Sequence, residues 1–136
     1  MRVVLTDGGR FKAGFKGLAN DCVCRAVAIV KTEPYEKVYA EINSICRELG
    51  YKGLTARKGL PKDVMFEVMK RLGFTWEALC APGSKQRIHL SESELPGGRI
   101  ICRVTRHVVA VIDGVIYDNH DPQRDEKRMV YGYWHL

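Results

Sequence analysis

Residues 106–122 read RHVVAVIDGVIYDNHDP and predict a β-hairpin. Two runs rich in valine and isoleucine flank Asp113 and Gly114, and Asp-Gly between apolar runs is the strongest short-range sign of a two-residue hairpin turn. Such a turn fixes the register of the two strands, so Ile112 is expected to pair with Val115. The pairing then continues outward, residue by residue, along both strands.

This register brings a histidine close to an acid. It places Val109 opposite Asp118 and His107 opposite His120, and it makes Asp118 a diagonal neighbour of His107, within reach of its imidazole. Because side chains alternate faces along a strand, Asn119 points the other way. The face of His107 and Asp118 is expected to hold also Val109, Val111, Ile116 and His120. A carboxylate in that position would fix the imidazole tautomer and stabilise its charged form.

A second stretch, NDCVCRAVAIV at residues 20–30, predicts the start of a helix. Asn20 and Asp21 are good N-cap residue types, and the helix is expected over about residues 21–31. Its buried face follows from the helical spacing of four apolar residues, which are Val23, Ala26, Val27 and Val30.

Two cysteines lie near this helix start, and they are not equivalent. Cys22 falls in the first turn, where free backbone N–H groups and the helix dipole stabilise an anion and can lower the pKa of a thiol. Cys24 lies about 200° further round the helix, given ~3.6 residues per turn. The two sulfurs therefore cannot face the same partner, and Cys24 is expected to pack in the core.

The remaining pattern predicts one α+β domain over residues 1–136. Further helices are expected over 34–48 and between Pro61 and Gly73, the latter two being residue types typical of helix ends. After a short extended stretch near the start, strands are expected at residues 87–90, 99–105, 107–112, 115–119 and 128–134. N-terminal helices followed by strands indicate helices packed on one face of a C-terminal antiparallel sheet.

Composition excludes several classes of protein. The chain has 136 residues, of which 46% are hydrophobic and 28% charged, and no apolar run approaches the ~20 residues of a membrane span. The net charge of +6 comes from scattered basic residues, so nucleic-acid binding is not the expected role. Five cysteines, an odd number, and no export signal indicate a cytoplasmic protein with free thiols. Cys46 and Cys102 are expected in the core and Cys80 in a loop.

The sequence resembles the small papain-like proteins encoded by phages and prophages, which are mostly uncharacterised cysteine peptidase homologues. The resemblance runs from about residue 7 to 134. It is carried by NDCVCRA followed by PYEKVYAEIN, and by RHVVAVIDGVIYDNHDP followed by VYGYW. It implies a papain-like fold with Cys22 as nucleophile, His107 as general acid and base, and Asp118 as the orienting group. The order of cysteine, histidine and acid agrees with this assignment.

The implied activity is that of a thiol hydrolase, a peptidase or amidase, which cleaves a peptide or amide bond in a protein or peptide substrate through an acyl-enzyme. It needs no cofactor, and a phage-encoded protein would act in the cytoplasm of the host. The alternative is a non-catalytic binding protein of the same fold that engages a phage or host protein. A zinc site made by Cys22, Cys24, His107 and His120 is a further, weaker alternative.

Some positions depart from the papain pattern. The glutamine that completes the oxyanion hole of papain corresponds to Lys16, whose ammonium can donate hydrogen bonds but is poorly preorganised. The backbone N–H of Cys22 can supply one donor, and Asn20 is the other side-chain candidate. A bulge in the hairpin would make Asn119 the third member in place of Asp118. Two further residues, His120 and Trp134, are candidates to line the site.

Overall fold

The computed structural model describes residues 1–80 and 87–136. Within these residues the chain forms three α-helices, six β-strands and one 3₁₀ turn. The helices are α1 (Cys22–Lys31), α2 (Tyr35–Glu48) and α3 (Lys62–Arg71). The strands are β1 (Val3–Leu5), β2 (Thr75–Ala78), β3 (Arg99–Val104), β4 (His107–Ile112), β5 (Val115–Asp118) and β6 (Gly132–His135), and the 3₁₀ turn η1 is Glu92–Glu94. This is the α+β class expected from the sequence.

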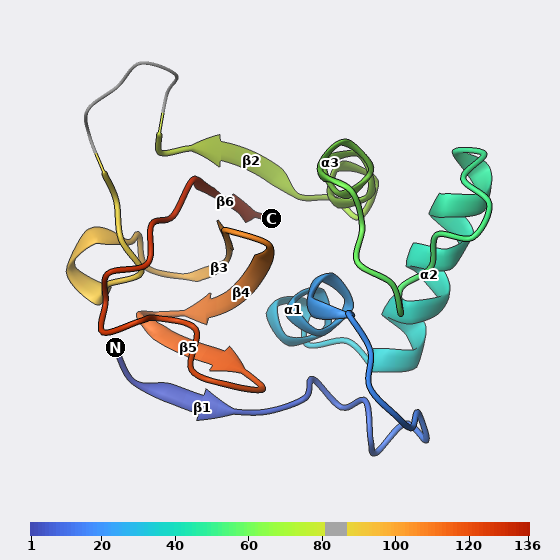
Figure 1. Cartoon of the computed structure of the whole chain (residues 1–136), viewed down its shortest axis with the longest axis horizontal. Coiled ribbons are helices and arrows are strands. Elements are labelled where there is room, and N and C mark those ends of the chain that lie inside the picture. Colours follow the sequence, from blue (N-terminus) through green and yellow to red (C-terminus); the bar gives the residue numbers. More distant parts are fainter. Residues whose placement is uncertain (81–86) are drawn as a thin grey trace.

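The six strands form one mixed sheet in the order β1-β5-β4-β3-β6-β2. Figure 1 shows the sheet nearly edge-on, with β2 at the top, β1 at the bottom and all three helices on the same side. The expectation of a purely antiparallel sheet is wrong, because β1 pairs with β5 in parallel. The other strand pairs are antiparallel.

The sheet separates two apolar clusters. On the helix side, residues of all three helices pack against sheet residues that include Val108, Ala110 and Trp134. On the opposite side, Val109, Val111 and other strand residues pack with apolar residues of the segments between strands. Helix α1 lies between the sheet and α2 (Figure 1), so its buried residues belong to the centre of the first cluster.

Helix α1 has the apolar stripe expected from the sequence. The four residues predicted for the buried face of α1 are each at most 5% exposed. In α2 and α3 the buried residues likewise recur at helical spacing. None of the described helices is both long and apolar enough to cross a membrane.

The outer strands differ more from the expectation. The stretch at 87–90 makes only an isolated bridge, between His89 and Met129. The strand expected over 128–134 is shorter and shifted, at Gly132–His135. Strand β2 was not predicted, because its sequence TWEA is short, lacks a β-branched run and is exposed at three of its four positions.

Candidate active site

The hairpin of β4 and β5 forms as its turn predicts. Asp113 and Gly114 have φ angles of 48° and 79°, as a type I′ turn requires at both central positions. Ile112 pairs with Val115, and the register continues to Ala110 and Tyr117. Beyond this point the ring of His107 reaches Asp118, and Nε2 lies 2.6 Å from Oδ2.

The predicted sharing of faces is only partly right. Val109, Val111 and Ile116 do lie in one cluster, on the sheet face away from the helices. His107 and Asp118 instead contact residues of α1. His107 is the first residue of β4 and Asp118 the last of β5. Strict alternation does not hold at these strand ends, where the side chains turn toward the helix.

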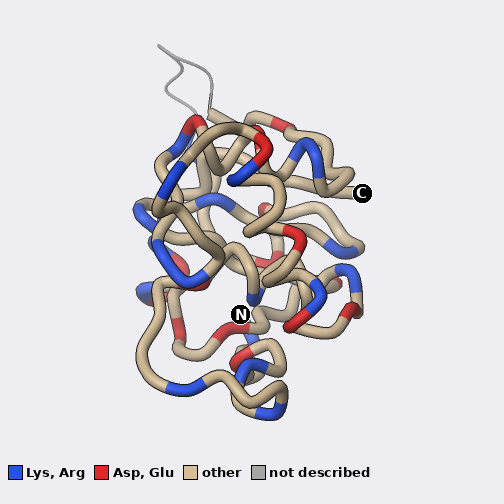
Figure 2. Tube along the Cα trace, turned by 90° about the vertical axis from the view of Figure 1, so that its right-hand side faces the viewer, with Lys and Arg blue, Asp and Glu red and all other residues tan. Residues whose placement is uncertain are grey.

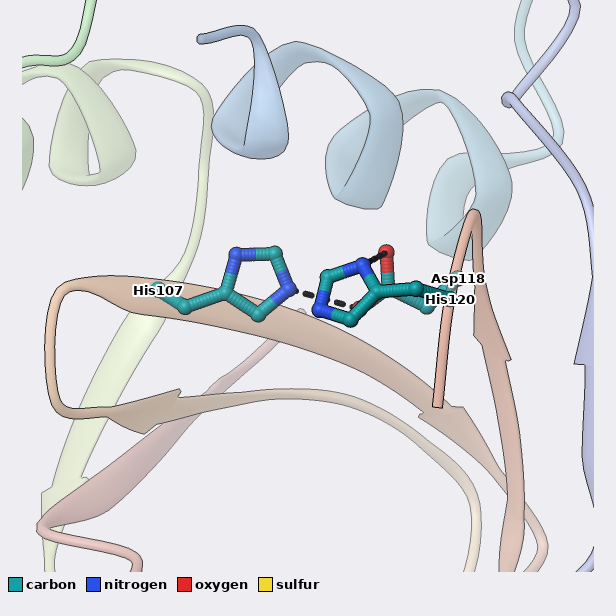
Figure 3. Close-up of side chains that lie close together, drawn as sticks. All are labelled: His107, Asp118 and His120. Atoms are coloured by element: carbon teal, nitrogen blue, oxygen red, sulfur yellow. Dashed lines mark hydrogen bonds and ion pairs between the residues drawn. The ribbon is translucent and has the colours of Figure 1, made fainter. Parts of the chain in front are cut away.

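Cys22 is the first residue of α1 and lies against His107. The thiol is half-buried, and burial by itself opposes its ionisation, but a hydrogen bond with His107 and the charge of that ring lower the pKa of Cys22 below its ordinary value. The backbone N–H of Val108 and the charge of Arg25 act in the same direction. Since His107 uses Nε2 toward Asp118, its Nδ1 is the ring nitrogen left for the sulfur; in Figure 3 that nitrogen lies on the side of the ring facing α1.

The imidazole is held in its charged form. Burial would lower the pKa of His107, but hydrogen bonds with Asp118 and Cys22 raise it from its ordinary value of 6.5 to about 9. The pKa of the thiol is lowered and that of the imidazole is raised, so both shifts favour a thiolate–imidazolium pair. Such a pair is the activated form of a cysteine nucleophile.

Asp118 is almost fully buried, with 4% of its surface exposed. Burial would raise its pKa, yet the hydrogen bond and charge of His107 lower it below its ordinary value, so the group is a carboxylate. Its second oxygen accepts the backbone N–H of Asn119 at 2.7 Å and lies 3.6 Å from Nη2 of Arg25. The carboxylate is therefore fixed from both sides.

A buried network of charges continues from Asp118 into the core. Arg25, at one end of the network, also binds Asp21 through Nη1. Asp21 accepts the hydroxyl of Tyr35 at 2.7 Å and lies 3.9 Å from Arg10, and Arg10 in turn donates to the same hydroxyl at 2.7 Å. The four charged residues are each at most 7% exposed. Two arginines thus balance two buried carboxylates directly behind Cys22.

The network has a consequence for the helix start. Asp21 is the N-cap residue of α1, as expected, but its side chain makes no capping hydrogen bond. Its carboxylate is used by Arg25 and Tyr35 instead. The backbone N–H groups of the first turn, including that of Cys22, therefore keep their capacity to bind an incoming anion.

Cys22 and His107 open into a pocket of about 340 Å³. Asn20, Arg106 and His120 also line it, as expected for Asn20 and His120. Lys16 does not; it lines a neighbouring hollow of about 320 Å³. Of the two side chains considered for the oxyanion hole, Asn20 is therefore the one that borders the pocket.

Other expected residues take different places. The side-chain oxygen of Asn119 lies 2.7 Å from Nδ1 of His120, so Asp118 and not Asn119 contacts His107. Trp134 does not line the site: it is 1% exposed and packs against Phe66 and Trp76 near α3.

The structural cysteines behave as core residues. Cys24 is fully buried with its sulfur 3.8 Å from the carbonyl oxygen of Tyr35, and burial, reinforced by Asp21, raises its pKa to about 12. Burial also raises the pKa of Cys102 to about 12 and that of Cys46 above its ordinary value. Cys22 differs from these three thiols in that its surroundings favour ionisation.

A metal site is poorly supported. Among the described residues, His107, Asp118 and His120 offer ligand atoms within 4.8 Å of one another, whereas the set with Cys22 and Cys24 is not brought together. However, one oxygen of Asp118 is bound to His107 and the other faces the guanidinium of Arg25. A fixed positive charge beside that carboxylate opposes a metal cation.

The roles of Arg25, Arg10, Tyr35 and Arg106 were not predicted from the sequence. The spacing of Asp21 and Arg25, one helical turn apart, was the only signal for the network. Arg106 has a φ of 56°, in the left-handed region that non-glycine residues rarely adopt. That conformation belongs to the turn before β4 and places Arg106 at the pocket.

Comparison of the chain with protein-family models, with curated proteins and with solved structures finds no match.

Proposed function

We propose that the protein is a thiol hydrolase of papain-like fold that cleaves a peptide or amide bond. One observation carries the proposal. His107 is hydrogen-bonded to Cys22 on one side and to the buried Asp118 on the other, beside an open pocket. A nucleophile, a base and a group that orients the base are the parts such catalysis needs.

The proposed reaction has two steps. The thiolate of Cys22 attacks the carbonyl carbon, and the oxyanion that forms is stabilised by the backbone N–H of Cys22 and by Asn20. His107 then protonates the leaving amine as the C–N bond breaks, which leaves a thioester on Cys22. His107 next takes a proton from water, whose oxygen attacks the thioester. The C–S bond breaks, the acid product leaves, and the thiolate of Cys22 beside the imidazolium of His107 is restored.

A non-catalytic binding protein is the second candidate. It is favoured by Lys16, the counterpart of the papain glutamine, which lies outside the pocket of Cys22. In that case the pKa of Cys22 would still be lowered by His107, but the oxyanion would lack a strong side-chain donor. Turnover of amide substrates therefore separates the two candidates.

The pH dependence of alkylation tests the ion pair. We expect iodoacetamide to modify Cys22 selectively at pH 6, because His107 and Arg25 lower the pKa of its thiol below the ordinary value. Cys80, the other half-buried thiol, is the internal comparison. In His107→Ala the rate at Cys22 should fall by about tenfold or more, since each unit added to the pKa lowers the thiolate fraction about tenfold. Mass spectrometry of peptides after labelling between pH 5 and 9 gives the rates.

His120→Ala is the matched control, because His120 lines the same pocket and packs its ring 5.1 Å from that of His107, while its hydrogen bond goes to Asn119 and not to Cys22. It should keep the labelling of Cys22 at pH 6. Equal and slow labelling of Cys22 and Cys80 at that pH would refute the thiolate, and with it the hydrolase. Selective labelling without cleavage in a broad peptide screen would favour the binding protein.

A further inference from the structure

Three hollows meet beside Cys22. The pocket of Cys22 and His107 shares Ala19 and Asn20 with a hollow of about 460 Å³ that Arg57 and Lys58 line. It shares Ala19, Asp21, Arg25 and Asn119 with the 320 Å³ hollow of the loop that follows β1. The segment 18–20 borders all three, and Arg57 holds it through hydrogen bonds to Leu18 and Asn20. A ligand in the site would therefore extend along this segment.

The rim of these hollows carries unbalanced positive charge. Lys16, Arg57, Lys58 and Arg106 are exposed, and within the described residues none of them forms an ion pair with a carboxylate. We call these four residues the basic rim. Figure 2 shows Lys and Arg positions, in blue, at the lower end of the molecule, where the loop after β1 lies.

The acidic side chains near the basic rim already have other hydrogen-bond or ion-pair partners. Asp21 is buried and bound by Arg25 and Tyr35. Asp7 accepts the backbone N–H groups of Gly9 and Phe11, at 2.9 Å each. Among the described residues neither acid forms an ion pair with the basic rim, so an acidic ligand would give these cations carboxylate partners.

Two large apolar side chains border the same hollows. Phe11 is 80% exposed and Leu18 is 95% exposed, the two highest values among the exposed large hydrophobic residues. Both line the hollow of the loop after β1. Covering them would remove apolar surface from water, so a ligand with a large apolar side chain would gain from contact here.

We propose that the hollows around the basic rim bind an acidic polypeptide segment that carries a large apolar side chain, and that such segments are the substrates. This inference rests on the proposed hydrolase and names its substrate class. Charge of this kind raises the association rate and discriminates between partners more than it adds affinity. Binding should therefore weaken with rising salt.

Peptide binding to the Cys22→Ala protein tests the inference without any need for turnover. The probes are three fluorescein-labelled peptides that share one central phenylalanine and differ only in their flanks, which are glutamate, glutamine or lysine. We expect the glutamate peptide to bind about tenfold or more tightly than the glutamine peptide, with the difference reduced at high salt. Fluorescence anisotropy gives the dissociation constants.

Charge reversal locates the binding surface. Lys16→Glu with Lys58→Glu should abolish the preference for the glutamate peptide, and these exposed side chains make no hydrogen bond or ion pair among the described residues. Lys52→Glu with Lys70→Glu changes the net charge equally at exposed positions elsewhere and should keep the preference. Circular dichroism melting curves confirm that each variant is folded.

Two outcomes would overturn the inference. One is equal binding of the three peptides, or a preference that Lys52→Glu with Lys70→Glu removes equally well. The other is displacement of the glutamate peptide by a single-stranded oligonucleotide at lower concentration than by unlabelled peptide, which would identify a nucleic-acid surface. If Cys22 of the unsubstituted protein is still labelled selectively at pH 6, the hydrolase itself remains supported.

Discussion

At the scale of single residues, the contacts of His107 set the pH range of the ion pair with Cys22. Its pKa of about 9 reflects burial, which opposes the charge, and two hydrogen-bonded partners, which favour it. A group with a raised pKa is charged below that pKa and loses its proton as the pH rises through it. The thiolate–imidazolium pair is therefore expected from the lowered pKa of Cys22 up to about pH 9.

Asp118→Asn should narrow this pH range. The substitution keeps the size of the side chain but removes the carboxylate charge that raises the pKa of His107, so that pKa should fall from about 9 toward 6.5. The upper limit of the ion pair then falls as well, so the imidazolium is lost between about pH 6.5 and 9, and the labelling rate of Cys22 changes most in that range. Titration of the His107 ring by NMR, together with the labelling rates, measures both effects.

Asp121→Asn is the matched control for this prediction. Asp121 is exposed, lies close to Asp118 in the sequence, and bonds Gln123 rather than His107. It should leave the titration of His107 near its original midpoint. A midpoint that also stays near 9 in Asp118→Asn would mean that the carboxylate does not hold the imidazolium.

The contact of His107 with Asp118 could be predicted from the sequence, whereas the buried charge network behind Cys22 could not, for a physical reason. The contact of His107 with Asp118 follows from a two-residue turn, which relates the two strands locally. The bond between Arg10 and Tyr35 joins a glycine-rich loop to the start of α2, and no periodicity predicts it. Long-range polar contacts of this kind depend on the tertiary fold.

At the scale of elements, the buried charge network joins α1, α2 and the loop after β1. Gly8 shows how close the loop lies: a Cβ added there would sit 3.1 Å from Cα of Arg25, and its φ is 72°. Tyr35 at the start of α2 bonds both Asp21 and Arg10. The hydroxyl of Tyr35 therefore connects three segments around the helix that carries Cys22.

Tyr35→Phe should destabilise the fold by about 1.5–3 kcal/mol, the usual range for a lost hydrogen bond to a charged group. The buried carboxylate of Asp21 and the guanidinium of Arg10 would each lose a partner. Urea denaturation followed by circular dichroism gives the free energy of unfolding. Tyr39→Phe is the control, because Tyr39 packs against the same Phe15 ring but its hydroxyl makes no hydrogen bond within the described residues. An equal loss of unfolding free energy in both variants would refute the role of the network.

Elements with a strong apolar periodicity of their own could be predicted from the sequence, whereas strands that form only by pairing with their neighbours could not. The helices and the β4–β5 hairpin carry their own apolar patterns. Strands β1 and β2 lie at the two edges of the sheet and have three and four residues. Their pairing is set by β5 and β6, so the sequence gives no local sign that β1 runs parallel to its neighbour.

At the scale of the whole molecule, the candidate active site and the β2 edge of the sheet lie in different regions. Cys22, His107 and Asp118 come from α1, β4 and β5, whereas β6 and β2 complete the sheet on the far side of β3. The aromatic cluster of Phe66, Trp76 and Trp134 packs there, between α3 and the sheet. Damage to this edge should therefore lower overall stability without altering the ion pair.

Gly132→Ala tests this separation. A Cβ at Gly132 would contact the ring of Trp76 and lie 2.5 Å from the carbonyl oxygen of Glu77, which is backbone and cannot move without disturbing the pairing of β2 with β6. Overpacking of this kind costs about 1–3 kcal/mol, and urea denaturation should show that loss of stability. Gly97→Ala is the control and should keep its stability, because its Cβ would meet nothing closer than 3.9 Å. The pH profile of Cys22 alkylation should stay unchanged in both folded variants, because the ion pair depends on α1 and the hairpin. A shifted profile in Gly132→Ala would instead mean that the β2 edge and the site act as one unit.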